Sequence, residues 1–470
     1  MTSARLEAGS FRDRHGQIYH FQGRILRGVS ETALGNWKQL QVTGFYKAFS
    51  EAGQIVKTWM PHNITPADVD PAAGWAGLLE HEPITTISYP YEWTFSMLRD
   101  AALLHLKLVQ AALDEGMILK DSTPYNIQFE KGVPVFIDIP SLEIYEPGSA
   151  WVGYRQFCQM FLYPLMFQAY KNLPFQSFLK GSIDGITPEE AEAIFSFRDR
   201  FRSGVFSHAY LQSKLQVRYS AQQKSVSKDL KNAGFNQELI KANIRRLIKL
   251  VKKLEWKPPG SEWAEYAEFH NYNDTDHQRK ESFVADAARA VDGSVVWDVG
   301  CNTGQFSRIA AAYADTVIAL DADHLAVEFL YQHLKEGDEK NILPLVMNLS
   351  DPSPNWGWRG TERTELANRA APDLVLCLAL LHHAVISANV PVRQFVEWLA
   401  SLDTNVVIEF VGRDDEKVKQ LLRNKADQYE DYYPDYFEQC LIDHFTIENR
   451  MQFNEGRREI FFCRKKQLAD

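Results

Sequence analysis

The sequence lacks the features that define several classes of protein. Its five cysteines form no C-x-x-C motif, so we expect neither a disulfide framework nor a zinc site, and no metal centre. The longest apolar run, residues 374–381, is far too short to span a bilayer. The first residues have no apolar core typical of a signal peptide. These absences predict a cytoplasmic protein without a membrane span.

An excess of positive charge is also missing. The chain has 51 Lys and Arg against 61 Asp and Glu, which gives a formal net charge of -10. Binding to duplex DNA or bulk RNA needs a positive field, so the composition argues against either as the main partner, and we expect no DNA partner. A chain of 470 residues is too long for one ordinary core, so two or more domains are expected.

A glycine-rich turn organises the second half of the chain. The stretch SVVWDVGCNTGQFS, residues 294–307, has an apolar run that ends on Asp298. Gly300, Asn302 and Gly304 follow, and then a segment with helical character. Glycine, and to a lesser degree Asn, tolerates the positive φ of a tight turn. The pattern predicts a buried strand, a turn and a helix, where a ligand meets bare main chain.

The next predicted strand identifies the type of ligand. TVIALDAD, residues 316–323, contains Asp321 about 20 residues beyond the turn, the spacing at which an acid meets a ribose diol. The pattern D-x-G-C-N-T-G resembles motif I of the class I S-adenosylmethionine (SAM) methyltransferases, and Asp321 matches their ribose acid. The G-x-G-x-x-G motif of dinucleotide-binding folds is absent.

Strands and helices alternate through this half, which predicts an α/β, Rossmann-like fold with a seven-stranded, mostly parallel sheet. An antiparallel hairpin, formed by residues 445–453 and 458–466 around Gly456, should close the sheet. The parallel strands are expected at residues 295–298, 316–321, 342–347, 373–378 and 405–410.

The resemblance implies SAM as the cofactor, bound at the carboxyl ends of the strands. Asn348 follows the third strand, where the family usually has an Asp that accepts from the adenine amino group. The amide oxygen of Asn348 can still accept such a hydrogen bond. The expected cofactor-binding residues are Asp298, Gly300, Cys301, Asn302, Gly304, Asp321, Ala322, Asn348, Leu349 and Leu378.

Two adjacent histidines are candidates for the general base. His382 and His383 follow the fourth strand, whose carboxyl end faces the methyl group in this fold. Neighbouring residues point in different directions, so we expect His382 to reach the acceptor, with a pKa near 6.5, and His383 to pack. Glu409, at the end of the fifth strand, is a second candidate base or orienting residue. The N/D-P-P-Y signature is absent, which disfavours methylation of DNA bases.

The first half of the chain predicts an α+β domain. Residues 10–90 are expected to be β-rich and short in helix, and a long helix follows from residue 94. Asp121, Asn126 and Asp138 then resemble the catalytic segment of protein and aminoglycoside kinases, in which an Asp base is followed by two magnesium ligands. Leu119 replaces the usual His, Ile-Pro replaces Phe-Gly, and no glycine-rich phosphate loop is visible. An active kinase, an inactive kinase-like lobe and a coincidence all remain open.

The expected domains are an N-terminal domain over 1–220, whose kinase-like part covers 91–220, a linker and basic helix over 221–256, and a methyltransferase domain over 257–470. The basic amphipathic helix suits a membrane or an acidic partner, or a packed connecting helix. An aromatic cluster precedes the glycine-rich turn and could close over the cofactor or acceptor, or pack at a domain seam. Its members are Trp263, Tyr266 and Tyr272.

Segments along most of the chain resemble a bacterial SAM-dependent methyltransferase family labelled after the nodulation host-specificity proteins of rhizobia. They include GMILKDSTPYNIQF, WVGYRQFCQMFLYPL, LALLHHAVISANVP and VIEFVGRDD. The resemblance implies methyl transfer to a hydroxyl or carboxyl of a saccharide-like or other small acceptor. A bifunctional kinase–methyltransferase, a protein or RNA acceptor, and a protein that only binds SAM remain alternatives. The oligomeric state is open.

Overall fold

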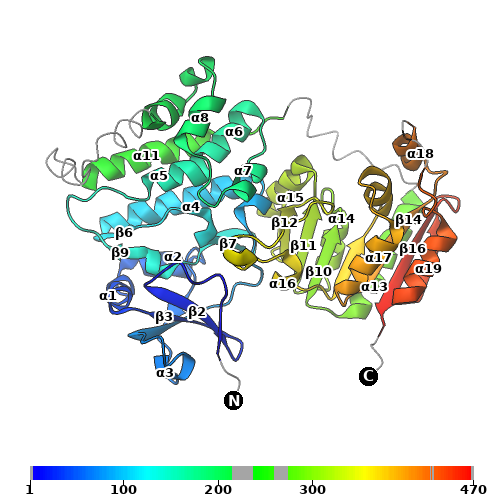
Figure 1. Ribbon diagram of the computed structural model, residues 1–470, viewed down its shortest axis with the longest axis horizontal. Helices are drawn as coiled ribbons and strands as arrows, with labels where there is room; N and C mark the ends of the chain where they lie inside the picture. The colour runs from blue at the N-terminus through cyan, green and yellow to red at the C-terminus, as the bar shows by residue number, and fades with distance from the viewer. Residues whose placement is uncertain (1–3, 214–236, 259–273, 424, 426–427, 467–470) are drawn as a thin grey trace. The chain divides into compact units, whose positions relative to one another are not determined.

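The computed structural model describes residues 4–213, 237–258, 274–423, 425 and 428–466. The chain divides into two compact units. Unit 1 comprises Met1–Pro259 and Asn355–Arg363, and unit 2 comprises Gly260–Pro354 and Thr364–Asp470 (Figure 1). Residues 355–363, which fall inside the sequence range expected for the methyltransferase domain, therefore belong to unit 1. The polar stretch from 222 to 236 lies outside the described residues.

Unit 1 contains an antiparallel five-stranded sheet with the strand order β1-β2-β3-β5-β4. Alternating side chains of its strands face a small apolar core that includes Tyr19, Leu26 and Leu78. Two short two-stranded sheets, β6-β9 and β7-β8, complete the strands of the described part of this unit. The strands are β1 Arg5–Leu6, β2 Gly16–Phe21, β3 Arg24–Val29, β4 Thr58–Trp59, β5 Gly77–His81, β6 Met117–Leu119, β7 Ile127–Glu130, β8 Val133–Phe136 and β9 Leu142–Ile144.

Residues 10–90 contain more helix than their sequence predicted. The expectation of a region short in helix was wrong, because α1 (Glu31–Leu40) and α2 (Gly44–Glu51) both lie in it. Ser30 and Thr43 cap these helices through their side chains. The aromatic residues of this stretch suggested strands, although the buried positions of α1 have helical spacing.

The long helix predicted from residue 94 is α4 (Phe95–Asp114), with Thr94 as its capping residue. Its neighbour is the basic amphipathic helix, α11 (Gln237–Lys253), which buries Ile240, Ile244 and Leu247. The packed-helix interpretation of that segment therefore holds for its apolar face. The remaining α-helices in the described part of unit 1 are α3 Pro66–Val69, α5 Tyr154–Phe157, α6 Tyr163–Lys171, α7 Gln176–Gly181 and α8 Pro188–Ile194.

Unit 2 contains the predicted seven-stranded sheet, with the order β12-β11-β10-β13-β14-β16-β15. The first five strands in this order are parallel, and β16 pairs antiparallel with both β14 and β15. The strand order reverses direction at β10, so the sheet has a topological switch point beside that strand. The strands are β10 Val295–Val299, β11 Thr316–Asp321, β12 Ile342–Val346, β13 Leu374–Cys377, β14 Asn405–Val411, β15 Phe445–Phe453 and β16 Arg458–Lys465.

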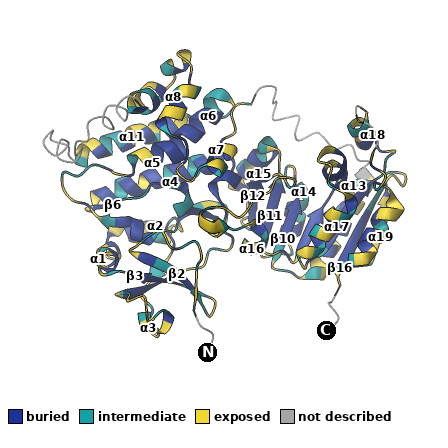
Figure 2. Ribbon diagram, in the orientation of Figure 1, coloured by how far each residue is buried: buried dark blue, intermediate teal, exposed yellow. Residues whose placement is uncertain are grey.

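The two faces of this sheet have different helical cover. Buried residues of α13 (Asp274–Val291), α14 (Gln305–Ala311) and α15 (His324–Glu336) share one apolar core with alternate strand residues. α17 (Val392–Ser401) and α19 (Pro434–His444) pack against each other, and Phe437 of α19 meets Phe410 and Phe461. Figure 2 shows the parallel strands as buried and the outer sides of the helices as exposed. The remaining α-helices among the described residues of unit 2 are α16 Leu366–Arg369 and α18 Glu416–Leu422.

Within the described residues, no helix is both long enough and apolar enough to cross a membrane.

Candidate functional site

The glycine-rich turn of unit 2 has the predicted conformation. Gly300, Asn302 and Gly304 all have positive φ, at 80°, 51° and 81°. A side chain at position 304 would also meet Leu330, because an added Cβ would lie 2.5 Å from its nearest atom. The amides of Gly300 and Cys301 both donate to the carbonyl of Leu320, at 2.8 and 3.0 Å. The turn is thus attached to the end of the neighbouring strand, β11.

Asp321 lies at the last position of β11 and faces this turn. One of its carboxylate oxygens accepts from the amide of Asn302 at 2.8 Å, and the other accepts from the amide of Asp323 at 2.9 Å. Burial raises the pKa of Asp321 above its ordinary value, while these backbone hydrogen bonds act in the opposite direction. The carboxylate is therefore fixed in orientation by main-chain donors, and each oxygen keeps a lone pair for a ligand.

Asp298 lies in β10, two residues before Gly300. It is buried and accepts from the hydroxyl of Ser307 at 2.5 Å. Burial raises its pKa to about 6. Cys301 is also buried, and burial raises the pKa of its thiol, so its side chain packs and only its main chain faces the turn.

The other expected cofactor residues are spread along the same edge of the sheet. Asn348 is exposed just beyond β12, and its side-chain oxygen accepts from the amide of Ser350 at 3.0 Å. Ala322 is exposed next to Asp321, and Leu349 is half-buried next to Asn348. Leu378 is buried in the core beyond β13. Of Asn348, Ala322, Leu349 and Leu378, it is thus Leu378 that contributes to the packing of the core.

The two histidines are arranged in the opposite way to our expectation. His382 is buried, with 2% of its surface exposed, and its Nδ1 has no hydrogen-bond partner among the described residues. Burial, His383 and Arg458 lower its pKa to about 3, so the pKa near 6.5 that we predicted is wrong. His383 is exposed at the start of a π-helical turn, η8 (His383–Ser387). The π-helical turn that begins at His383 explains this arrangement, because it directs the ring of His382 inward.

Of the two histidines, His383 has the position and the pKa shift that better suit a catalytic group. Its ring lies 4.3 Å from that of His382. Although much of its surface is exposed, burial of the rest of the side chain lowers the pKa of His383 below its ordinary value, and the negative charge of Asp321 opposes that shift. His383 therefore lies within electrostatic reach of the carboxylate at the end of β11.

Glu409 forms a buried network of charges that the sequence did not reveal. Its carboxylate is fully buried and meets the ammonium group of Lys280 at 2.6 Å. Its other oxygen meets the guanidinium of Arg458 at 3.1 Å. Arg458 also pairs with Asp415 at 2.7 Å. Both oxygens of Glu409 are paired, so its role is structural. A role as the general base is not supported.

Two features of the sequence indicate this network. Lys280 lies three, four and seven residues before Phe283, Val284 and Ala287, and these three are buried in the core below the sheet. Lys280 is therefore on the buried stripe of α13. Arg458 lies two and four residues before the buried Ile460 and Phe462 on β16. Every second residue of a strand faces the same side, so Arg458 lies on the same buried face. A lysine or arginine at such positions indicates a buried carboxylate partner.

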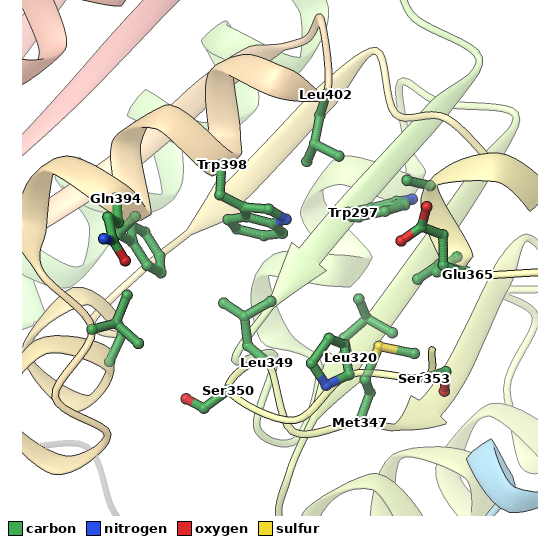
Figure 3. A pocket seen from close by; sticks show the side chains of 16 residues that line it. Trp297, Leu320, Met347, Leu349, Ser350, Ser353, Glu365, Gln394, Trp398 and Leu402 are labelled. Carbon is green, nitrogen blue, oxygen red and sulfur yellow. The ribbon is translucent and has the colours of Figure 1, made fainter. Parts of the chain in front are cut away.

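A cavity of about 200 Å³ lies in unit 2, on the face of the sheet opposite this network. Figure 3 shows Trp297 of β10 and Trp398 of α17 near one part of it, and Met347 and Leu349 near another. Its polar lining consists mainly of Ser350, Ser353, Glu365 and Gln394. The cavity is mostly apolar with a few polar groups, which is the usual composition of a small-molecule site.

Asp138, one of the kinase-like residues of unit 1, pairs with an arginine. The carboxylate of Asp138 pairs with Arg27 of β3 at 2.7 Å and accepts from the side chain of Asn126 at 3.4 Å. Burial raises the pKa of Asp121, and the nearby negative charge of Asp138 raises it further. Asp138 therefore joins Asn126 to Arg27, which the sequence did not single out, and its charge reaches Asp121.

The three aromatic residues expected near the cofactor or acceptor belong to residues 259–273. Trp263, Tyr266 and Tyr272 lie outside the described residues. Among the residues that are described, no group of three or more His, Cys, Asp or Glu side chains is placed to hold a metal ion.

The strand order of unit 2 and its glycine-rich turn followed by a strand-end acid define the class I methyltransferase fold. The chain is 32% identical over 463 residues to "Nodulation protein NoeA" of Rhizobium meliloti (strain 1021), covering 97% of this chain and 95% of that protein. The chain therefore belongs to the NoeA family. No family model matches the sequence.

Among solved structures, the chain resembles the N-methyltransferase NodS from Bradyrhizobium japonicum WM9, with 11% identity, a TM-score of 0.30, and coverage of 42% of this chain and 99% of that one. It also resembles the bifunctional kinase-methyltransferase WbdD, with 17% identity, a TM-score of 0.30, and coverage of 42% and 41%.

Proposed function

We propose that the protein is a SAM-dependent methyltransferase. The observation that supports this most directly is the pairing of the glycine-rich turn with Asp321, whose carboxylate is oriented by the amide of Asn302. The residues present fit this cofactor, because a carboxylate held by main-chain donors can accept from both hydroxyls of a ribose. SAM, when bound, supplies an activated methyl group on its sulfonium.

Each side chain around the turn has a separate task in this proposal. Asp321 accepts from the ribose, and the bare main chain at Gly300 and Gly304 allows the ligand to approach closely. Asn348 accepts from the adenine amino group, and the apolar surface of Met347 and Leu349 at the edge of the cavity covers the base. Asp298 stays behind the turn and fixes the start of α14 through Ser307.

We assign proton transfer to His383. It is exposed, it lies within electrostatic reach of Asp321, and its lowered pKa keeps the ring neutral and able to accept a proton at neutral pH. His382 supports the ring of His383 from behind, because it is buried and lies 4.3 Å away. Positioning of the acceptor next to the methyl group supplies a large share of the rate in such reactions.

The acceptor in this proposal is a hydroxyl or carboxyl of a saccharide-like or other small molecule, and the site of action is the cytoplasm. The five cysteines are free and buried, which is consistent with a reducing compartment. The test is incubation of the protein with radiolabelled SAM and fractionated cell extract, followed by identification of the labelled fraction. Label in a small-molecule fraction supports the proposal. Label only in protein or RNA would replace this acceptor class, and SAM binding without any labelled product would contradict enzymatic methyl transfer.

A second candidate function is phosphoryl transfer by unit 1, favoured by the convergence of Asp121, Asn126 and Asp138. We expect no ATP turnover, because the guanidinium of Arg27 already pairs with the carboxylate that would hold magnesium. Calorimetry with ATP and magnesium checks this expectation. Tight, magnesium-dependent ATP binding that is lost in Asp138→Asn would prove it wrong.

A further inference from the structure

We propose that unit 1 docks on an anionic lipid surface through an aromatic–basic patch. This patch comprises the aromatic residues Phe197, Phe201, Phe206 and Tyr210, together with Arg198, Arg200, Arg202, Arg246 and Lys253. The inference is independent of the methyltransferase proposal, since every residue of the patch lies in unit 1.

Phenylalanine side chains project into solvent from a short stretch of the chain. Phe201 is 82% exposed, Phe197 is 69% exposed and Phe206 is 49% exposed. Water-exposed phenylalanine is unfavourable, and a contiguous exposed apolar patch in a folded protein usually marks an interaction surface.

Ring contacts join these side chains into one patch. Phe197 and Phe201 lie side by side, with ring centroids 5.8 Å apart. The guanidinium of Arg200 lies over the rings of both Phe197, at 5.5 Å, and Tyr210, at 3.9 Å. Tyr210 in turn stacks on Phe206 at 5.6 Å. The aromatic side chains are thus held together by a cation that lies among them.

The backbone beneath the patch is anchored to the core of unit 1. Phe195, directly before the patch, is buried and meets the ring of Phe167 at 5.3 Å. Asp199 is buried within the patch segment and pairs with Lys171 at 2.9 Å and with Arg202 at 3.2 Å. Val205 is fully buried. Because these buried residues anchor the segment, the exposed phenylalanines between them face outward.

Positive charge borders the aromatic side chains. Gly204 packs so closely on Leu250 of α11 that an added Cβ would lie 2.5 Å from it. Arg246 and Lys253, four residues before and three residues after Leu250, lie along that side of the helix, and both are exposed. Arg198 and Arg202 are exposed beside Phe197 and Phe201. The patch is therefore basic on a chain whose formal net charge is -10.

This combination fits the headgroup boundary of an anionic bilayer. Aromatic side chains insert at that depth, and Lys and Arg close to the surface are attracted by acidic headgroups. A single-stranded nucleic acid fits less well, because bases need open, parallel ring faces for stacking. Here the rings of Phe197 and Phe201 are nearly perpendicular, at 83°, and Arg200 already lies over Phe197 and Tyr210.

The experiment is co-sedimentation of the full chain with vesicles of phosphatidylcholine, with and without phosphatidylglycerol. We expect binding only to the anionic vesicles, and weaker binding as salt is raised. Two variants, Phe197→Ser/Phe201→Ser and Arg246→Glu/Lys253→Glu, should each weaken binding about tenfold or more. Phe201→Trp should retain it, because indole also suits the headgroup boundary.

Matched controls change exposed side chains elsewhere in unit 1. Val42→Ser/Ile144→Ser removes two exposed apolar side chains, and Lys38→Glu/Lys47→Glu reverses two exposed charges. Both controls should bind vesicles like the unaltered chain, and all variants should keep its melting temperature. The proposal is overturned if the chain does not sediment with anionic vesicles. It is also overturned if patch and control variants lose equal affinity, or if the chain binds a single-stranded oligonucleotide and no vesicles.

Discussion

Asp138 of unit 1 and Asp321 of unit 2 illustrate two fates of an aspartate at the end of a strand. Asp138 follows β8 and pairs with the guanidinium of Arg27 at 2.7 Å. Asp321 ends β11 and accepts from two main-chain amides, and no Lys or Arg pairs with it among the described residues. A carboxylate already neutralised by a guanidinium has little capacity for a cation or a ribose. We therefore expect unit 2 to hold the small-molecule ligand.

The largest effect is expected from Glu409, which contrasts with Asp138 because it is fully buried and pairs with two cations. Glu409→Ala should lower the free energy of unfolding by roughly 3–5 kcal/mol, because Lys280 and Arg458 would remain buried without a counter-charge. Denaturant unfolding measures this change. Asp138→Ala, whose carboxylate is more accessible, is the comparison and should cost less. Equal losses in the two variants would contradict the distinction between the two networks.

The next effect concerns the two histidines. His383→Ala should lower turnover by roughly 10²–10⁴ while SAM affinity is retained, because the proposed base is removed and the turn is not. His382→Ala should act mainly on stability, since that ring is buried. The assay is turnover and SAM affinity measured in parallel once an acceptor is known. Normal turnover in His383→Ala together with a large loss in His382→Ala would reverse the assignment.

The pH dependence of turnover follows from the lowered pKa of His383. The neutral ring accepts the proton, so activity should be constant above the ordinary pKa of 6.5 and should fall only as the pH drops below it. A pH–rate profile of the unaltered chain and of His383→Ala checks this expectation. A profile in which the activity of the unaltered chain falls as the pH rises from 6.5 would contradict a neutral histidine base.

A smaller effect is expected for Asp298, whose pKa is raised to about 6 by burial. The folded protein holds this proton more tightly than the unfolded chain does, so ionisation of Asp298 reduces stability as the pH rises. Asp298→Asn should therefore stabilise the fold by about 3 kcal/mol near neutral pH. The gain should be absent below the ordinary pKa of 3.8, grow up to about 6 and stay constant above it. Asp286→Asn, at an exposed site on α13, should show no such window. A gain that does not depend on pH would count against this explanation.

The sequence predicted unit 2 more completely than unit 1, for a physical reason. Parallel strands buried on both faces give apolar runs, and the turn at Gly300 and Gly304 needs residues that tolerate positive φ. In unit 1, the same aromatic and apolar residues suited either a strand or a helix. The caps at Ser30 and Thr43 were the signals of helix that the prediction did not use.

At the site, the sequence identified residues that depend on local order and missed those that depend on tertiary contacts. Asp321 could be found because its distance from the turn is fixed by the strand–turn–helix unit. The pairing of Glu409 with Lys280 joins residues 129 positions apart, and that of Asp138 with Arg27 joins residues 111 positions apart. The inward direction of His382 depends on the π-helical turn that begins at His383, which has no sequence signature of its own.

The most direct test is calorimetric titration of SAM into the unaltered chain, Asp321→Ala and Asp138→Ala. Loss of the charge-assisted hydrogen bonds to the ribose should weaken binding about tenfold or more in Asp321→Ala. Asp138→Ala should bind SAM with the affinity of the unaltered chain, because its carboxylate belongs to the other unit. Unchanged affinity in a folded Asp321→Ala variant would contradict the assignment of the cofactor site to the glycine-rich turn of unit 2.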